Sequence, residues 1–125
     1  MTYRLLSADL VNAIHDSILS AGDVRGRAGD KSLDGTLARV DNRLVYGLIS
    51  DIFDLAAAYA VAIARGQCFN DGNKRTAFQC MDICLDLNGR QAVWDVEAVG
   101  DLIVRVAQGN VDEADLAEWL RTRMA

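Results

Sequence analysis

Hydrophobic positions recur every three or four residues along most of the chain, which is the period of amphipathic α-helices. The first predicted helix follows Ser7, a good N-cap residue, and runs to about Ser20, with Gly22 ending it. The same period recurs throughout the chain, which contains no proline and no internal repeat. We therefore expect an all-α fold.

A second helix is predicted to open at Ser32 or Asp34 and to reach about Asn42. Before it, residues 22–32 hold three glycines and three basic residues, a composition typical of an exposed loop near a site or a partner. After it, residues 44–50 continue irregularly or as a short helix. We therefore expect a flexible, exposed loop over residues 22–32, followed by a short helix and an irregular segment.

The helix predicted to begin at Asp51 and to end at Gly66 is apolar on nearly every side. Its large and small apolar residues are Ile52, Phe53, Leu55, Ala56, Ala57, Tyr59, Val61 and Ile63. A further helix is predicted over residues 74–87. We expect a compact helical bundle in which the helix from Asp51 is the buried centre and the next helix is its partner.

In the last third of the chain, residues 91–94 have the apolar and β-branched character of one short β element. Asp95 then caps a predicted helix that reaches about Gln108, and Asp112 caps the final one. The apolar stripe of that final helix is formed by Leu116, Trp119 and Leu120.

The composition predicts one domain spanning residues 1–125. A chain of 125 residues with 51% hydrophobic and 25% charged residues matches ordinary globular proteins. The formal net charge of -5 argues against direct nucleic-acid binding through a broad basic surface.

Cys68, Cys80 and Cys84 lack the spacing of a disulfide framework or a zinc site, so we interpret them as core thiols. With no signal peptide and no span long enough for a membrane, we expect a cytoplasmic location.

The most informative stretch is residues 67–75, between the two long apolar helices. Gly72 and Asn73 allow the backbone to curl at the start of the second helix, where unpaired amides and the positive end of the helix dipole attract phosphate. Lys74 and Arg75 add two positive charges, and the carboxylate of Asp71 suits Mg²⁺. The loop therefore predicts a nucleotide site.

A simpler interpretation is a turn whose Asn or Asp caps the helix and whose basic residues are solvated. We favour the anion site because cations in the first turn oppose the helix dipole unless an anion binds. Arg65 is a weaker candidate for phosphate charge. Phe69 carries no polar chemistry, and we expect it to anchor the loop in the core. His15, the one histidine, we interpret as a packed or hydrogen-bonded structural residue.

These loop residues resemble the signature of the Fic/Doc family, a His followed by Phe, Gly, Asn and a basic end. Residues in register are Phe69, Asp71, Gly72, Asn73, Lys74 and Arg75. Similarity extends over most of the chain, including His15, Asp16, Asp34 to Leu37, Tyr46, Gly47 and Ala56 to Ala58. Lys74 after the Gly and Asn pair resembles the Doc branch, the toxins of toxin–antitoxin modules. The resemblance implies a Fic-type helical bundle.

Gln67 stands where this family has its catalytic His. An amide cannot accept a proton near neutral pH, so Gln67 cannot serve as a general base. Either the chain is a naturally silent relative, or the His was replaced deliberately because an active toxin would poison its host. We favour the second explanation because the rest of the motif is intact.

The resemblance implies a protein kinase that transfers the γ-phosphate of ATP to a Thr of elongation factor Tu, with Mg²⁺ as cofactor, and so stops translation. It assigns Asp71 to the metal, Gly72 and Asn73 to phosphate, and Lys74 and Arg75 to phosphate charge in catalysis. The chain lacks the internal inhibitory motif of some Fic proteins, so we expect control by a Phd-type antitoxin and a monomer when free. The alternatives are a Fic-type protein AMP transferase and a noncatalytic antitoxin-binding relative.

Overall fold

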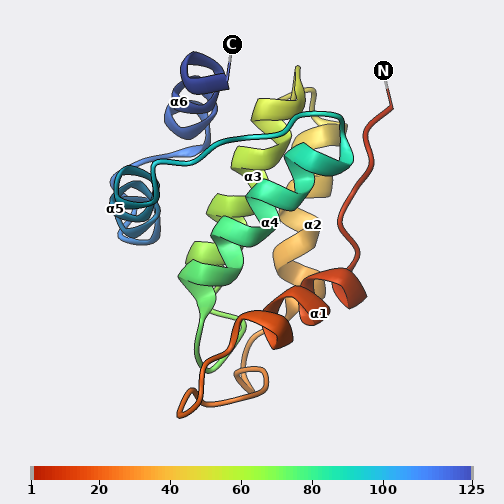
Figure 1. Cartoon of the computed structure of the whole chain (residues 1–125). Coiled ribbons are helices and arrows are strands. Elements are labelled where there is room, and N and C mark those ends of the chain that lie inside the picture. The colour runs from red at the N-terminus through yellow and green to blue at the C-terminus, as the bar shows by residue number, and fades with distance from the viewer. Residues whose placement is uncertain (1, 125) are drawn as a thin grey trace.

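The computed structural model describes residues 2–124, apart from the side chain of Met124. Within that range the chain folds into helices without a strand, which confirms the all-α prediction. The helices are α1 (Ala8–Ile18), α2 (Leu33–Val45), α3 (Ile52–Gly66), α4 (Asn73–Leu87), α5 (Val96–Ala107) and α6 (Glu113–Met124). Figure 1 shows α3 and α4 side by side at the centre, with α1 across one end and α5 and α6 along one side.

The helix starts follow from side-chain caps. Ser7 Oγ accepts a hydrogen bond from the amide of Leu10, and Ser32 Oγ accepts one from Gly35. Asp51, Asp95 and Asp112 cap α3, α5 and α6 in the same way. The predicted N-termini are therefore correct to within a residue or two.

Two predicted helix ends are wrong by a few residues. Helix α1 stops at Ile18 rather than Ser20, and the carbonyl of Ile18 accepts a hydrogen bond from Arg75 of α4. Helix α2 continues past Asn42 to Val45, since the carbonyl of Asn42 still accepts a backbone bond from Tyr46. A contact with the distant Arg75 is made at the end of α1, and α2 gains almost one further turn. Neither can be read from the local sequence.

The β element predicted over residues 91–94 is also wrong. These residues run between α4 and α5 without a partner strand in the described chain. Trp94 instead anchors the connection, because its indole N–H donates to Asp82 at 3.0 Å and its ring stacks parallel to that of Trp119. A β-like composition without a neighbouring strand gives an extended connection rather than a strand.

Helix α3 is the buried centre of the bundle, as predicted. Every residue from Leu55 to Ala64 is buried, and α4, α2, α5 and α6 all pack against it. Gly66 at its end permits the closest approach: a Cβ there would lie 2.8 Å from Thr36 Oγ1 on α2. The end of α3 is thereby fixed against α2, directly before the loop that begins at Gln67.

The three cysteines lie in this core. Burial raises the pKa of both the Cys80 and the Cys84 thiol to about 12, so neither forms a reactive thiolate near neutral pH. Cys68 is also buried, with its sulfur 2.9 Å from Thr36 Oγ1. The prediction of core thiols is confirmed.

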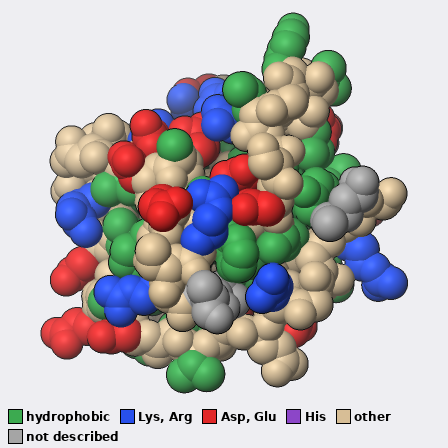
Figure 2. All heavy atoms as spheres, turned by 90° about the horizontal axis from the view of Figure 1, so that it is seen from above, with side chains coloured by type: hydrophobic (Ala, Val, Ile, Leu, Met, Phe, Trp, Pro, Cys, Tyr) green, Lys and Arg blue, Asp and Glu red, His purple; other side chains and the backbone are tan. Residues whose placement is uncertain are grey.

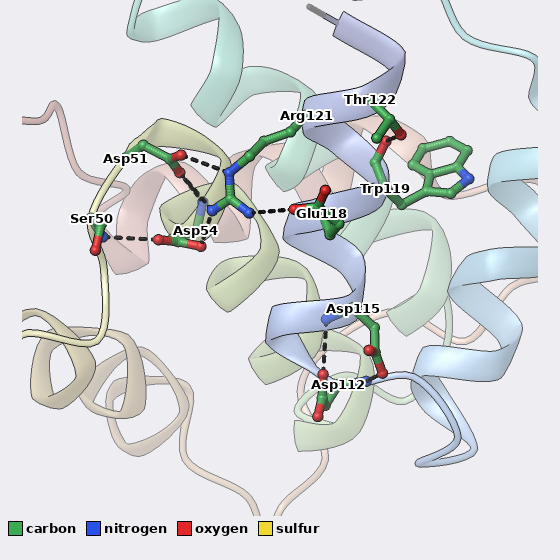
Figure 3. Close-up of polar contacts among 9 residues, drawn as sticks. All are labelled: Ser50, Asp51, Asp54, Asp112, Asp115, Glu118, Trp119, Arg121 and Thr122. Atoms are coloured by element: carbon green, nitrogen blue, oxygen red, sulfur yellow. Dashed lines mark hydrogen bonds and ion pairs between the residues drawn. The ribbon is translucent and has the colours of Figure 1, made fainter.

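An arginine fastens α6 to the start of α3. Arg121 bonds the carboxylates of Asp51 and Asp54, and also pairs with Glu118 on its own helix (Figure 3). Figure 2, which looks down on the molecule from above, shows acidic and basic side chains interspersed with apolar ones rather than a patch of one sign. None of the helices in the described chain is long and apolar enough to cross a membrane.

Candidate functional site: the loop before helix α4

Residues 67–72 form the turn between α3 and α4, at the end of the bundle where the 19–32 connection also lies (Figure 1). Two residues of this turn adopt the left-handed conformation. Gly72 does so at φ 80°, where glycine suffers little strain. Gln67 does so at φ 54°, and it is the one described residue other than glycine with a positive φ. Gln67 is the C-cap residue of α3, and helices commonly end with a residue in this conformation.

The 19–32 connection holds the turn by backbone pairing. The amide of Ala28 donates to the carbonyl of Cys68 at 2.8 Å, and the amide of Asn70 donates to the carbonyl of Gly26 at 3.1 Å. The side chain of Asn70 adds a bond to the carbonyl of Arg25 at 3.0 Å. These bonds form a short antiparallel contact, so two segments more than forty residues apart in sequence shape one surface.

The side chain of Asn73 closes the turn from the helix side. Its Oδ1 accepts the amide of Phe69 at 3.1 Å, and its Nδ2 donates to the carbonyl of Phe69 at 2.9 Å. Both polar atoms of this side chain are therefore occupied, so Asn73 would meet a phosphate with its backbone amide rather than with its side chain. Phe69 itself is 3% exposed and stacks on the ring of His15 at 3.8 Å between centroids.

The start of α4 presents unpaired amides. Gly72 is the N-cap residue and has no side chain to accept them, and the first in-helix bond is made by the amide of Thr76. Within the described chain the backbone N–H groups of Asn73, Lys74 and Arg75 have no acceptor. The first turn also lacks an acidic residue. An anion is the partner that such a helix start favours.

The two cations beside these amides differ in their environment. Lys74 is exposed, and its ammonium group has no ion pair with another described residue. Arg75 forms an ion pair with Asp23 at 2.9 Å, and the hydrogen bond from Arg75 lowers the pKa of the Asp23 carboxyl. Lys74 is thus free to meet a ligand, whereas Arg75 must share its charge with Asp23.

Asp71 lies half-buried between the two segments. One carboxylate oxygen, Oδ2, accepts the amide of Val24 at 3.2 Å, and its backbone carbonyl faces His15. The described side chains include no cluster of three or more His, Cys, Asp or Glu around it that could hold a metal alone. A cation here would need oxygens from a bound phosphate as further ligands, which is the usual coordination of Mg²⁺ at nucleotide sites.

Arg65 does not join the loop, contrary to the prediction that it adds charge for phosphate. Its guanidinium donates to the carbonyl of Val106 at 3.0 Å and to that of Val111 at 2.7 Å. These bonds tie α3 to the end of α5 and to the connection before α6. The structure therefore does not bring the Arg65 guanidinium together with the residues of the turn.

The structure also shows contacts to the site that the sequence did not specify. His15 reaches the loop from α1, and Asp23 and Asn70 link the loop to the 19–32 connection. The sequence had indicated only that residues 22–32 form a loop near a site or a partner and that His15 is a packed or hydrogen-bonded residue. The pairing itself joins residues about fifty positions apart, which no local spacing reveals.

Gln67 is exposed at the edge of the turn, directly before the buried pair Cys68 and Phe69. No hydrogen bond from its side chain to another described residue is present. Its amide therefore faces solvent beside the helix start that carries the free N–H groups. Gln67 occupies the position at which the Fic/Doc family, which the loop residues resemble, has its catalytic His.

The chain is similar to known proteins over most of its length. The model of the Fic/DOC family matches residues 5–85, which include α1 to α3, the whole loop and all but the last two residues of α4. The chain is 37% identical over 119 residues to the protein kinase doc of Escherichia phage P1, with 94% of each chain covered. It is 37% identical over 124 residues to the toxin Doc of Mycolicibacterium smegmatis strain ATCC 700084 / mc(2)155, covering 96% of this chain and 92% of that one. This chain is a homologue of Doc toxins and belongs to the Fic/DOC family.

Proposed function

We propose that this chain is a Doc-type toxin that binds Mg²⁺ and ATP at the loop before α4, and that Gln67 prevents it from phosphorylating its target. The observation that carries the proposal is the helix start itself, where unpaired amides follow a left-handed Gly72 that is flanked in sequence by Asp71 and Lys74. Relatives named as a protein kinase and as a toxin, each covered over nearly its full length, support the same function.

The residues present fit a magnesium triphosphate. The backbone amides of Asn73, Lys74 and Arg75 would bind phosphate oxygens, and the Lys74 ammonium would offset their charge. Asp71 would hold Mg²⁺ together with those oxygens, and the bound ion would neutralise charge that builds up during transfer. Arg75 would contribute while remaining paired with Asp23, which limits its share.

Transfer also needs a base. In the active form, the hydroxyl of a Thr of elongation factor Tu would attack the γ-phosphorus of ATP, ADP would leave, and a side chain at position 67 would accept the hydroxyl proton. Gln67 has no basic lone pair near neutral pH. The chain would therefore retain nucleotide binding and lose turnover, with the rest of the loop still in place.

The test is to install the base. We expect Gln67→His to raise phosphoryl transfer to elongation factor Tu at least about a hundredfold, the usual contribution of a general base, and to arrest growth when expressed. Gln67→Asn is the matched control, because Asn tolerates the left-handed backbone but cannot accept the proton. Equal activity of the His and Asn variants, or none in either, would overturn the proposal of a silenced kinase.

Labelled ATP separates the kinase from the AMP transferase. With the Gln67→His protein, label at the γ position should reach the target and label at the α position should not. Transfer of the α label would instead favour the AMP transferase alternative. If neither label moves but an antitoxin still binds, the noncatalytic relative is the better description.

We also propose that a Phd-type antitoxin controls the protein by occupying a groove between α4 and α5. This groove has a volume of about 280 Å³, and Lys74 and Arg75 stand at its rim beside Phe78, Val99 and Ile103. An amphipathic segment with acidic residues would bury its apolar side there and cover Lys74. A disordered partner segment that folds on binding suits such a surface.

Gly100 offers a clean test of this groove. It lies on α5 at the groove, and a Cβ added there meets no atom within 4 Å, so Gly100→Glu introduces bulk and negative charge without a clash. We expect antitoxin affinity to fall at least about tenfold. Gly35→Glu is the control, since Gly35 is an exposed helical glycine on α2, away from the groove. Equal losses in both variants would count against this docking site, as would a stable oligomer of the free chain in light scattering.

A further inference from the structure

A histidine on α1 holds the turn from beneath. His15 is 1% exposed, and its Nε2 lies 2.7 Å from the backbone carbonyl oxygen of Asp71. Its ring stacks on that of Phe69 with an angle of 9° between the planes. Its other nitrogen, Nδ1, lies 3.6 Å from the carboxylate of Asp16. One side chain thus contacts two members of the loop, fifty-four and fifty-six positions further along the chain.

The chemistry of this contact sets its direction. A carbonyl oxygen only accepts hydrogen bonds, so Nε2 must carry the proton and donate it. The stack on Phe69 fixes the plane of the ring, and the hydrogen bond fixes the rotation of the ring toward Asp71. His15 is therefore a directed donor rather than a filler of space.

The bond determines where an amide points. All described peptide bonds are trans, and in a trans peptide the C=O and N–H groups point to opposite sides. The carbonyl of Asp71 and the amide of Gly72 belong to one peptide unit. With the carbonyl directed at α1, the amide of Gly72 is directed away from α1. Gly72 lacks a Cβ and could otherwise rotate this unit at little cost, so the unit needs an external restraint.

We infer that His15 is a positioning residue for the anion site: it orients the Asp71–Gly72 peptide so that the Gly72 amide joins the unpaired amides at the start of α4. This inference rests on the proposed nucleotide binding at that loop. His15 touches neither phosphate nor metal, and it acts through the peptide that separates the metal-binding side chain from the helix start. Its effect is on affinity rather than on the protein's fold.

Two substitutions separate the contribution of the hydrogen bond to Asp71 from that of the packing on Phe69. His15→Phe keeps a ring to stack on Phe69 and removes the donor. His15→Gln keeps an N–H donor at similar reach and removes the ring. We expect His15→Phe to lose only the thermal stability that one hydrogen bond contributes, while its affinity for magnesium ATP falls about tenfold. We expect His15→Gln to lose more stability and to bind more tightly than His15→Phe.

If His15→Phe is the more stable variant but binds magnesium ATP more weakly than His15→Gln, His15 positions the loop. If it only supported the fold, affinity would fall with stability. Tyr59→Phe is the control, because Tyr59 on α3 also uses one buried side-chain bond to hold a backbone group, the amide of Leu6 at 3.0 Å, and this bond involves no residue of the loop. It should lose stability and keep its nucleotide affinity. Affinity that simply follows stability across these proteins, or a His15→Phe protein that binds as wild type, would overturn the inference.

The amide resonance of Gly72 in a nitrogen-15 spectrum keeps this inference separate from the proposed function. If wild type gave no heat with magnesium ATP, the proposed function would fall. The peptide orientation would still be read from the spectrum: His15→Phe should shift the Gly72 resonance and leave most of α1 unchanged. A Gly72 resonance that stays in place would overturn the positioning role, whatever the nucleotide does.

Discussion

The centre of the bundle and the loop that ends α3 are built on opposite principles. From Leu55 to Ala64, α3 is buried, apolar and satisfied by its own backbone bonds. Three residues later Gln67 is exposed in a left-handed conformation, and the turn depends on bonds from α1, α4 and the 19–32 connection. The core is stable through packing, whereas the loop is shaped by directed hydrogen bonds that leave several amides free.

The difference shows where stability and binding can be separated. Burial of apolar surface is nondirectional and tolerates small movements, so it supplies most of the stability. An anion site needs donors held in one geometry, which hydrogen bonds provide and packing alone does not. Core substitutions should therefore affect unfolding, and loop substitutions should affect ligand affinity beyond any loss of stability.

Truncation in the core should have the largest effect on stability. Leu55 on α3 is fully buried, and Leu55→Ala should lower the free energy of unfolding by about 2–5 kcal/mol, measured by urea denaturation. Its affinity for magnesium ATP, measured well below the melting temperature, should match wild type. Val45, which is 80% exposed, gives the control Val45→Ala, with a change within about 0.5 kcal/mol. A selective loss of affinity in Leu55→Ala would contradict the separation.

Two asparagines at opposite ends of α4 sharpen the comparison. Asn73 bridges the amide and carbonyl of Phe69, and Asn88 bridges the amide and carbonyl of Arg4. Substitution of either by Ala should cost about 0.5–1.5 kcal/mol of stability, because each removes hydrogen bonds that hold backbone groups. Only Asn73→Ala should also weaken nucleotide binding, by about tenfold. Calorimetric titration of the Asn73→Ala and Asn88→Ala proteins with magnesium ATP measures this difference. Equal nucleotide affinities of the two variants would count against the loop as the nucleotide site.

Acid should weaken the attachment of α6 through the Arg121 network (Figure 3). Burial alone would raise the pKa of Asp51, but bonds from Arg121 and from the amide of Asp54 outweigh it and lower that pKa. A lowered folded-state pKa means that the stabilisation is present at neutral pH and disappears as pH falls below about 4. Melting curves should therefore show Asp51→Asn less stable than wild type at pH 7, with the gap closing below pH 4. A gap independent of pH would contradict this account.

The smallest effect is expected at Gln67. Its φ of 54° strains a residue with a Cβ, so Gln67→Gly should raise the free energy of unfolding by about 1 kcal/mol. Differential scanning calorimetry of the two proteins measures it. Because the loop is held by bonds from other residues, nucleotide affinity should stay within about twofold. Destabilisation by glycine would show that the Gln67 side chain makes a favourable contact in solution.

Local sequence was enough for the core and the helix starts. The unbroken apolar stretch of α3 and the caps Ser7, Ser32 and Asp51 act within a few residues of where they stand. The position of the helix start beside Gly72 and Lys74 was also readable, and its anion chemistry stays a prediction. The orientation of Arg65 was not readable, because its acceptors Val106 and Val111 lie over forty residues away.

The other differences have the same origin. Residues 91–94 have β-like composition, yet a strand needs a neighbour that the fold does not provide. The sequence did not reveal that the side chain of Asn73 closes the turn, because this depends on Phe69 presenting both backbone groups within its reach. His15 could be assigned a structural role from its helix, but its acceptor on Asp71 depends on how α1 crosses the end of α4.

The most direct test of the central claim is calorimetric titration of this chain, with Gln67 in place, by ATP in the presence of Mg²⁺. We predict saturable heat with one site per chain, and an affinity at least about tenfold weaker in Lys74→Ala, because the ammonium group offsets phosphate charge beside the free amides. Absence of heat, or the same affinity in the Lys74→Ala protein, would contradict the assignment of the start of α4 as a triphosphate site.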